Sequence, residues 1–262
     1  MTNYLKNEIK KTLFSKRFII ASLIVFLSII IPLIRTLNIG FTINEFKQFC
    51  DGNDAFILAR TDNILIIIAP LIATIIYSDS YLIDKQTGFL SHIYEKFSKR
   101  KYIQAKCIAN CICSGLAIAL PSLIALFIFI LLLGFNNTTL NQIVGPFSFI
   151  NDFSKTLYSL FLILLSFIFN SLFAMLGLGV SPWLKNKYLT FLFPFFYYIN
   201  SATIFPRIWL QNLNATFLFE PNLVVTEFDI ILYQIGLLIV GVLLFYLGVI
   251  KNHEETFLAT EL

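Results

Sequence analysis

Charged residues are scarce in this chain of 262 residues, where Asp, Glu, Lys and Arg make up 13% and hydrophobic residues 58%. So little polar surface cannot cover so much apolar side chain in water, which excludes a soluble domain. The long apolar runs are typical of an integral membrane protein. Because these runs are continuous rather than alternating, they also exclude the strands of a membrane barrel.

Several groups that catalysis or energy coupling would require are missing. The sequence contains no Gly-x-x-x-x-Gly-Lys-Ser/Thr phosphate loop, so any ATP must be hydrolysed by another chain. The two histidines, His92 and His253, are too few for a histidine-rich metal site or for activating a serine inside the membrane. No Asp or Glu lies near the middle of an apolar run, which argues against an ion-coupled carrier. We therefore expect a protein that is no enzyme and binds no cofactor.

The four cysteines form no recognisable framework of paired residues. Cys107, Cys111 and Cys113 crowd one end of an apolar run, while Cys50 stands alone. Their spacing matches no common zinc pattern, so we expect them to be small apolar residues rather than metal ligands.

Hydrophobic patterning predicts an all-α integral membrane protein, a single transmembrane domain over residues 1–262. About 20 apolar residues suffice for a helix to cross the hydrocarbon core. Six spans are predicted, at residues 18–34, 57–77, 107–133, 157–180, 188–204 and 230–250. Two polar side chains within spans, Asn170 and Gln234, are predicted to hydrogen-bond between helices.

The distribution of Lys and Arg predicts the orientation. Fourteen of the 19 fall before residue 18, at 85–106, at 185–187 and at 251, all on one side of the predicted topology. The positive-inside rule then places both termini in the cytoplasm of a multi-pass protein. This asymmetry also explains the net charge of +4 without nucleic acid as a partner.

Two further segments are apolar without spanning the membrane. Residues 1–17 place Leu5, Ile9 and Leu13 at four-residue spacing opposite lysines, which predicts an amphipathic helix on the cytoplasmic leaflet. That helix could be a lipid anchor alone, or it could also contribute to a docking surface for a partner. Residues 205–227 are too apolar for a free loop and too interrupted to span, so they favour a re-entrant hairpin or an aromatic interface helix.

The segment between the second and third predicted spans, residues 78–102, is basic, amphipathic and compatible with a helix. From Phe89 onward its apolar residues recur at i, i+3, i+4 and i+7, so that one helical face is apolar. His92, Glu95, Lys96 and Lys99 point away from that face. We expect a helix that a partner outside the bilayer can bind. The alternative is a loop that binds lipid headgroups only.

A short pattern of residues surrounds this helix. It consists of an acidic residue, a glycine four positions later, a leucine, a serine followed by basic residues, and a lysine that opens the third span. In this sequence these are Asp84, Gly88, Leu90, the run 98–102 and Lys106.

The pattern resembles the segment after the second span in permeases of the type-2 ABC exporter class. The resemblance implies that this segment is a coupling helix, docking in a groove of an ABC ATPase subunit that binds the ATP. The residues it assigns to this role are Asp84, Gly88, Leu90, Ile93, Tyr94, Phe97 and Arg100.

The resemblance further implies a permease that works with two ATPase copies and a second permease, identical or a sister chain, in a bacterial cytoplasmic membrane. It implies export of an apolar or amphipathic substrate such as a peptide antibiotic, lipid or drug, with a role in resistance to antimicrobial peptides. The alternative is a membrane protein that acts only by binding, as an immunity or receptor-like component.

Overall fold

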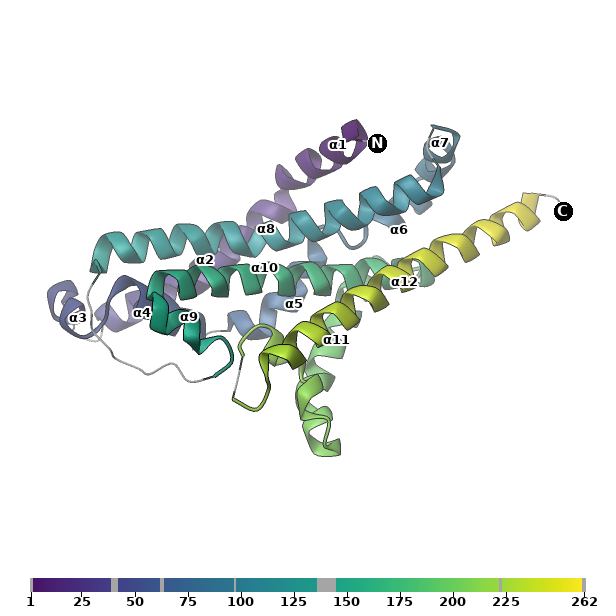
Figure 1. Cartoon of the computed structure of the whole chain (residues 1–262). Helices are drawn as coiled ribbons and strands as arrows, with labels where there is room; N and C mark the ends of the chain where they lie inside the picture. The colour runs from purple at the N-terminus through teal and green to yellow at the C-terminus, as the bar shows by residue number, and fades with distance from the viewer. Residues whose placement is uncertain are drawn as a thin grey trace.

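The chain, represented by a computed structural model, is described at residues 2–38, 42–61, 64–96, 98–135, 145–221 and 223–260. In these ranges it is mainly helical and contains no strand, which confirms the all-α prediction (Figure 1). The α-helices are α1 (Thr2–Leu13), α2 (Lys16–Asn38), α3 (Ile43–Phe49), α4 (Gly52–Thr61), α5 (Leu65–Ile75), α6 (Ser80–Gln86), α7 (Phe89–Lys96), α8 (Lys99–Leu133), α9 (Ser148–Phe153), α10 (Lys155–Val180), α11 (Lys187–Thr203) and α12 (Glu227–Thr260).

Five helical segments among the described residues are long and apolar enough to cross a membrane, as a multi-pass membrane protein requires. They are Lys16–Arg35, Leu65–Gln86, Lys99–Leu133, Lys155–Trp183 and Glu227–Lys251. The second begins later than predicted, at Leu65 instead of residue 57, because the residues before it belong to the separate helix α4.

The fifth predicted span, residues 188–204, corresponds to α11, which is not among these five segments. Its 17 residues would rise about 26 Å at 1.5 Å per residue, short of the roughly 30 Å of a hydrocarbon core. The helix ends at Thr203 and is followed by Phe205–Ile208, a turn of 3-10 helix. The chain therefore changes direction before α11 reaches full spanning length.

Residues 205–221 form single turns instead of a helical hairpin. The turns are Phe205–Ile208, Gln211–Leu213 and Ala215–Leu218, all of 3-10 type. The last turn packs inward, since Ala215, Leu218 and Phe219 are fully buried in the core. Re-entry of this segment into the membrane stays a prediction.

The long helices are arranged around α10. In the most apolar stretch of α10, 72% of the residues are buried inside the protein. The corresponding fraction is 33% for the span in α2 and 22% for the span in α12. The outer helices instead expose large apolar side chains, such as Leu23 and Leu27 on α2 and Ile239 and Leu243 on α12. Such surfaces are stable in contact with lipid and costly in contact with water.

The two ends of the bundle carry different elements. The helices α1, α6 and α7 lie at one end, together with the C-terminal end of α12, whereas α3, α4 and α9 lie at the other (Figure 1). Polar clusters form at both ends. Lys155 at the start of α10 makes ion pairs of 3.1 Å and 2.7 Å to Asp51 and Asp54 at the start of α4.

Close packing of α10 against α12 depends on two glycines. A Cβ built on Gly179 of α10 would lie 2.6 Å from the carbonyl oxygen of Gly241 on α12, a distance that real Cβ atoms do not adopt. Helices in lipid associate largely through such close approach of backbones, because lipid tails are as apolar as the helices themselves.

We expect Gly179→Ala to lower the free energy of unfolding by about 2 kcal/mol, since the added methyl must push α10 and α12 apart. Gly236→Ala is the matched control, because a Cβ there meets no heavy atom within 4 Å. The control should be neutral or slightly stabilising. SDS-induced unfolding in mixed micelles, followed by tryptophan fluorescence, measures both, and equal losses would contradict the packing argument.

Candidate functional site

The predicted coupling helix is a bent element. Two short helices, α6 and α7, are joined at Gly88, and we refer to residues 80–96 as the elbow. Gly88 has φ +71°, in the left-handed region that glycine adopts without strain. The amphipathic helix begins at Phe89, where the periodicity predicted it, and Asp84 lies on the separate helix α6 before the glycine. Phe97 itself lies outside the described residues.

The apolar face of α7 packs inside the protein. Ile93 is buried, and Leu90 and Tyr94 pack against the same small cluster, which includes Tyr102 of α8. The rings of Tyr94 and Tyr102 meet edge to face with centroids 5.7 Å apart. Burial, together with the nearby Asp84 carboxylate, raises the pKa of Tyr94 to about 12, so its hydroxyl stays protonated at neutral pH.

The opposite face of the elbow is open to its surroundings. His92, Glu95 and Lys96 are exposed, as the periodicity predicts, and so is Arg100 at the start of α8. Phe89, at the first position of α7, exposes 47% of its surface. The side chains left available for a partner are thus mainly polar, with Phe89 as an exposed apolar contact.

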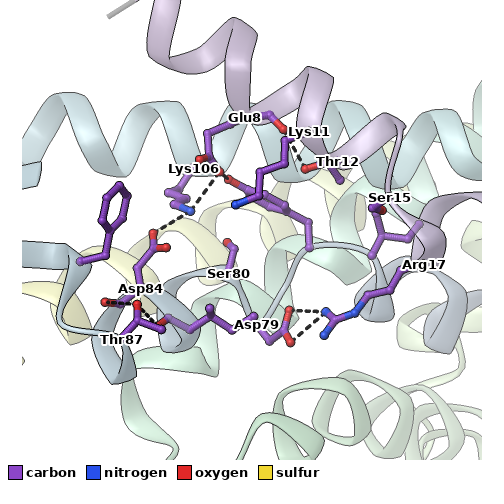
Figure 2. A pocket seen from close by; sticks show the side chains of 14 residues that line it. Glu8, Lys11, Thr12, Ser15, Arg17, Asp79, Ser80, Asp84, Thr87 and Lys106 are labelled. Atoms are coloured by element: carbon purple, nitrogen blue, oxygen red, sulfur yellow. Dashed lines mark hydrogen bonds and ion pairs between the residues drawn. The ribbon is translucent and has the colours of Figure 1, made fainter.

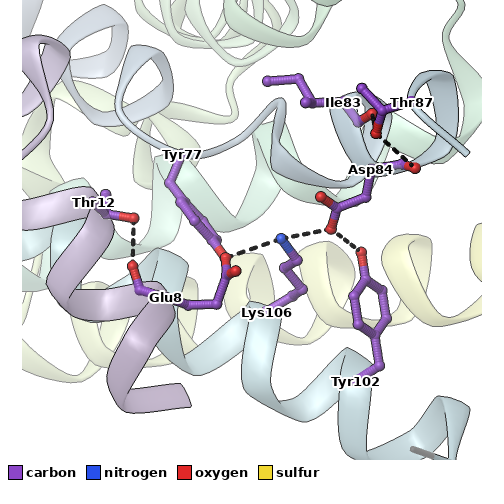
Figure 3. A network of polar contacts seen from close by, with 8 residues as sticks. All are labelled: Glu8, Thr12, Tyr77, Ile83, Asp84, Thr87, Tyr102 and Lys106. Carbon is purple, nitrogen blue, oxygen red and sulfur yellow. Dashed lines mark hydrogen bonds and ion pairs between the residues drawn. The ribbon is translucent and has the colours of Figure 1, made fainter. Parts of the chain in front are cut away.

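A buried lysine joins the elbow to the rest of the molecule. The Lys106 side chain on α8 is only 2% exposed, and its Nζ forms ion pairs with Asp84 Oδ2 on α6 (2.8 Å) and Glu8 Oε2 on α1 (3.2 Å). Figure 3 shows Lys106 between these two carboxylates. Burying an ammonium group costs several kcal/mol unless it is paired, and here two carboxylates pair with it.

Two tyrosines complete this network (Figure 3). The hydroxyl of Tyr102 donates to Asp84 Oδ2 at 2.8 Å, and the hydroxyl of Tyr77 donates to Glu8. Lys106 Nζ also lies 5.0 Å and 5.7 Å from the ring centroids of Tyr77 and Tyr102. Three elements that are distant in sequence, α1, the elbow and α8, are thereby fixed to one another.

A second ion pair holds the turn before the elbow. Arg17 Nη1, at the start of α2, donates to both oxygens of Asp79, at 2.8 Å and 2.9 Å. The Asp79 side chain is 1% exposed, whereas that of Arg17 is 41% exposed. The residue that leads into α6 is therefore tied to the first long helix.

A pocket of about 480 Å³ lies between α1 and the turn that joins α5 to α6 (Figure 2). Its lining includes both ion-paired groups and hydroxyl side chains from α1, α6 and the connection between α1 and α2. The charged residues in its lining are Glu8, Lys11, Arg17, Asp79, Asp84 and Lys106.

The amphipathic helix predicted at residues 1–17 is confirmed as a helix, but it ends at Leu13. Leu5, Ile9 and Leu13 pack against the buried core, and Lys6 and Lys10 are exposed. The apolar face of α1, which was expected to lie on lipid, therefore packs at least in part against the rest of the protein. Phe14, directly after the helix, is 77% exposed.

Buried polar residues away from the elbow have a structural role. Asn170 of α10 donates to the carbonyl of Ser114 on α8 at 3.3 Å, which confirms the predicted bond between helices. Arg60 of α4 is only 3% exposed. It donates to Ser166 Oγ at 3.1 Å and to the carbonyl of Phe219, and it lies 4.2 Å from the centroid of the Phe219 ring.

Sequence reasoning brought Asp84 and Lys106 into one motif, and the structure places them in contact. The sequence did not predict Glu8 as the second partner of Lys106 or Arg17 as the partner of Asp79, since these residues lie far apart in sequence. A signal was present, because Asp79 and Asp84 follow an apolar run directly and acids near lipid require cations.

The chain was compared with protein-family models, with curated proteins and with solved structures, and none of the three comparisons found a match.

Replacing Lys106 with methionine should destabilise the protein by about 3 kcal/mol, because Glu8 and Asp84 would then be left together without a counterion. Lys101→Met is the matched control on the same helix, since Lys101 is exposed. Unfolding in mixed micelles measures the two variants. If both lose the same amount of stability, Lys106 does not hold the junction.

Proposed function

We propose that this chain is the membrane-spanning permease subunit of an ATP-driven exporter that resembles the type-2 ABC class. It would work as a dimer of permeases, identical or sister chains, with two copies of a separately encoded ABC ATPase that binds and hydrolyses the ATP. The observation that supports this most is the elbow, which projects at the same end of the bundle as α1 and is fixed to α8 by the contact of Asp84 with Lys106.

The contacts of the elbow suit it to transmit force. Its helix α6 continues from the span that contains α5, and Asp84 ties it to α8. Its helix α7 packs through Ile93 and Tyr94 onto a cluster that also contains Phe245 of α12. A push on the exposed face, at Phe89, His92 and Lys96, would therefore move several spans together rather than bend a loop. Closure of the ATPase pair would supply that push.

The proposed topology has six spans, with α11 as a short fifth span before the apolar segment 205–227. Both termini and the elbow would lie in the cytoplasm of a bacterial cell. The excess of Lys and Arg at the elbow end supports this orientation, and ion pairing of Arg17 and Lys106 places part of that charge at the base of the spans.

The substrate would be apolar or amphipathic, such as a peptide antibiotic, a lipid or a drug. This assignment follows from helices whose surfaces consist of Phe, Leu and Ile, with no acidic residue near the middle of a predicted span. The cellular role that goes with it is export of, or resistance to, antimicrobial peptides.

The orientation can be tested with single cysteines at the two ends of the bundle. His92→Cys on α7 and Gln48→Cys on α3 place a thiol at exposed positions. A membrane-impermeant maleimide should label Gln48→Cys on intact cells and His92→Cys only after permeabilisation. The unmodified chain, whose four cysteines are buried or half-buried, provides the blank. The reverse pattern would overturn the proposed orientation.

The partnership can be tested by co-expression with an ABC ATPase encoded in an adjacent reading frame. The two chains should co-purify in equal amounts. Phe89→Asp should lower recovery of the ATPase roughly tenfold, since exposed aromatic residues at the centre of an interface contribute much of its binding energy. Phe153→Asp, at an 82% exposed phenylalanine in α9 at the other end of the bundle, is the control and should leave recovery unchanged.

Folded Phe89→Asp protein that retains the ATPase would contradict the role of the elbow. Absence of any ATPase in the preparation would favour the alternative function, a membrane protein that acts by binding alone. Substrate-stimulated ATP hydrolysis in liposomes, across a panel of peptides and lipids, then identifies the transported class.

A further inference from the structure

The pocket between α1 and the α5–α6 turn contains charges of both signs in equal number. Three cations, Lys11, Arg17 and Lys106, face three carboxylates, Glu8, Asp79 and Asp84. Its volume of about 480 Å³ is within the range of pockets that hold small molecules or headgroups. A lining that is formally neutral but strongly charged suits a ligand with one positive and one negative group.

The ion pairs of the pocket leave one cation unused. Arg17 pairs with Asp79, and Lys106 is shared by Glu8 and Asp84. No ion pair or hydrogen bond is found for Lys11 among the described residues, and Figure 2 shows its side chain reaching from α1 into the pocket. Lys11 is therefore available to a negatively charged group.

A second group in the pocket, the Ser80 hydroxyl, also lacks a hydrogen-bond partner among the described residues. Ser80 is only 8% exposed, and its Oγ has no hydrogen-bond partner in the part of the chain that the structure describes. Figure 2 shows this hydroxyl directed toward the pocket, between Asp79 and the side chains that descend from α1. Buried hydroxyls normally have a partner, so an unmet one beside a pocket points to a ligand oxygen.

The surplus carboxylate defines the other half of the ligand. Glu8 and Asp84 together carry one more negative charge than Lys106 neutralises. A second anion placed there would be repelled, whereas a ligand ammonium group would be attracted and could donate hydrogen bonds to both carboxylates.

The position of the pocket indicates where such a ligand comes from. One wall is α1, an amphipathic helix that ends beside the strongly exposed Phe14. Amphipathic helices with exposed aromatic residues lie at the boundary between headgroups and acyl chains, so the pocket opens where lipid headgroups are concentrated.

We propose that this pocket binds the phosphoethanolamine headgroup of a phospholipid. The phosphate lies against the Lys11 ammonium and the Ser80 hydroxyl, and the ethanolamine ammonium lies against Glu8 and Asp84. Because Asp84 belongs to the elbow, a bound lipid contacts α1 and the elbow at once. The proposal is independent of the partnership with an ATPase, and its test needs no ATPase.

The test uses the full chain in detergent and native mass spectrometry with short-chain phosphatidylethanolamine, phosphatidylcholine and phosphatidylglycerol, and with free phosphoethanolamine. We expect phosphatidylethanolamine to bind most tightly. Lys11→Ala should weaken it roughly tenfold, which is the effect of losing one charge-assisted hydrogen bond. Lys10→Ala is the matched control on the same helix, since Lys10 is exposed like Lys11 but does not line the pocket.

Neither variant removes a paired residue, so both should fold. Equal affinity of the two variants would overturn the site. Binding of phosphatidylcholine as tight as that of phosphatidylethanolamine would overturn the ammonium contacts, because a quaternary ammonium cannot donate hydrogen bonds. Tighter binding of phosphatidylglycerol would overturn the zwitterionic assignment. Equal affinity for free phosphoethanolamine would overturn the lipid as the source and assign the pocket to a soluble phosphate ester.

Discussion

The burial of the Lys106 ammonium group constrains the whole α1 end of the bundle. An unpaired charge at that depth would cost several kcal/mol, so α8 can hold Lys106 there only if Glu8 and Asp84 arrive at the same place. Meeting that condition fixes α1 and the elbow relative to a span. Tyr77 and Tyr102 each donate a further hydrogen bond to one of these carboxylates, Tyr77 to Glu8 and Tyr102 to Asp84. A segment that could have been a loose loop becomes a rigid extension of the bundle.

The rest of the bundle is held differently. Between the apolar parts of the helices there are few polar side chains that could form hydrogen bonds or ion pairs. The helices are held there by close backbone contact, such as that between Gly179 and Gly241. Ion pairs return at the opposite end, where Lys155 contacts Asp51 and Asp54. The chain thus combines tight packing of small residues in the middle with charge pairing at both ends, where water lowers the cost of a charged group.

Local sequence patterns predicted the helices well, but they did not predict which segments each helix contacts. The four-residue spacing of Leu5, Ile9 and Leu13 predicted α1, and the periodicity from Phe89 predicted where α7 begins, because amphipathic helices show their period in the sequence. What each apolar face would contact was not predictable. The face of α7 that seemed free for another protein packs on Tyr102 of its own chain, since burial depends on which distant segments come near.

The sequence by itself determined the helical class, the long apolar runs, the charge asymmetry and the start of the amphipathic helix at Phe89, because each follows from composition or period. Only the tertiary structure decided that α11 ends before full spanning length, that residues 205–221 fold into single turns, and that Glu8 pairs with Lys106 and Arg17 with Asp79. Those outcomes depend on long-range contacts. A charge in the sequence shows that a partner is needed, and only the folded chain shows which residue it is.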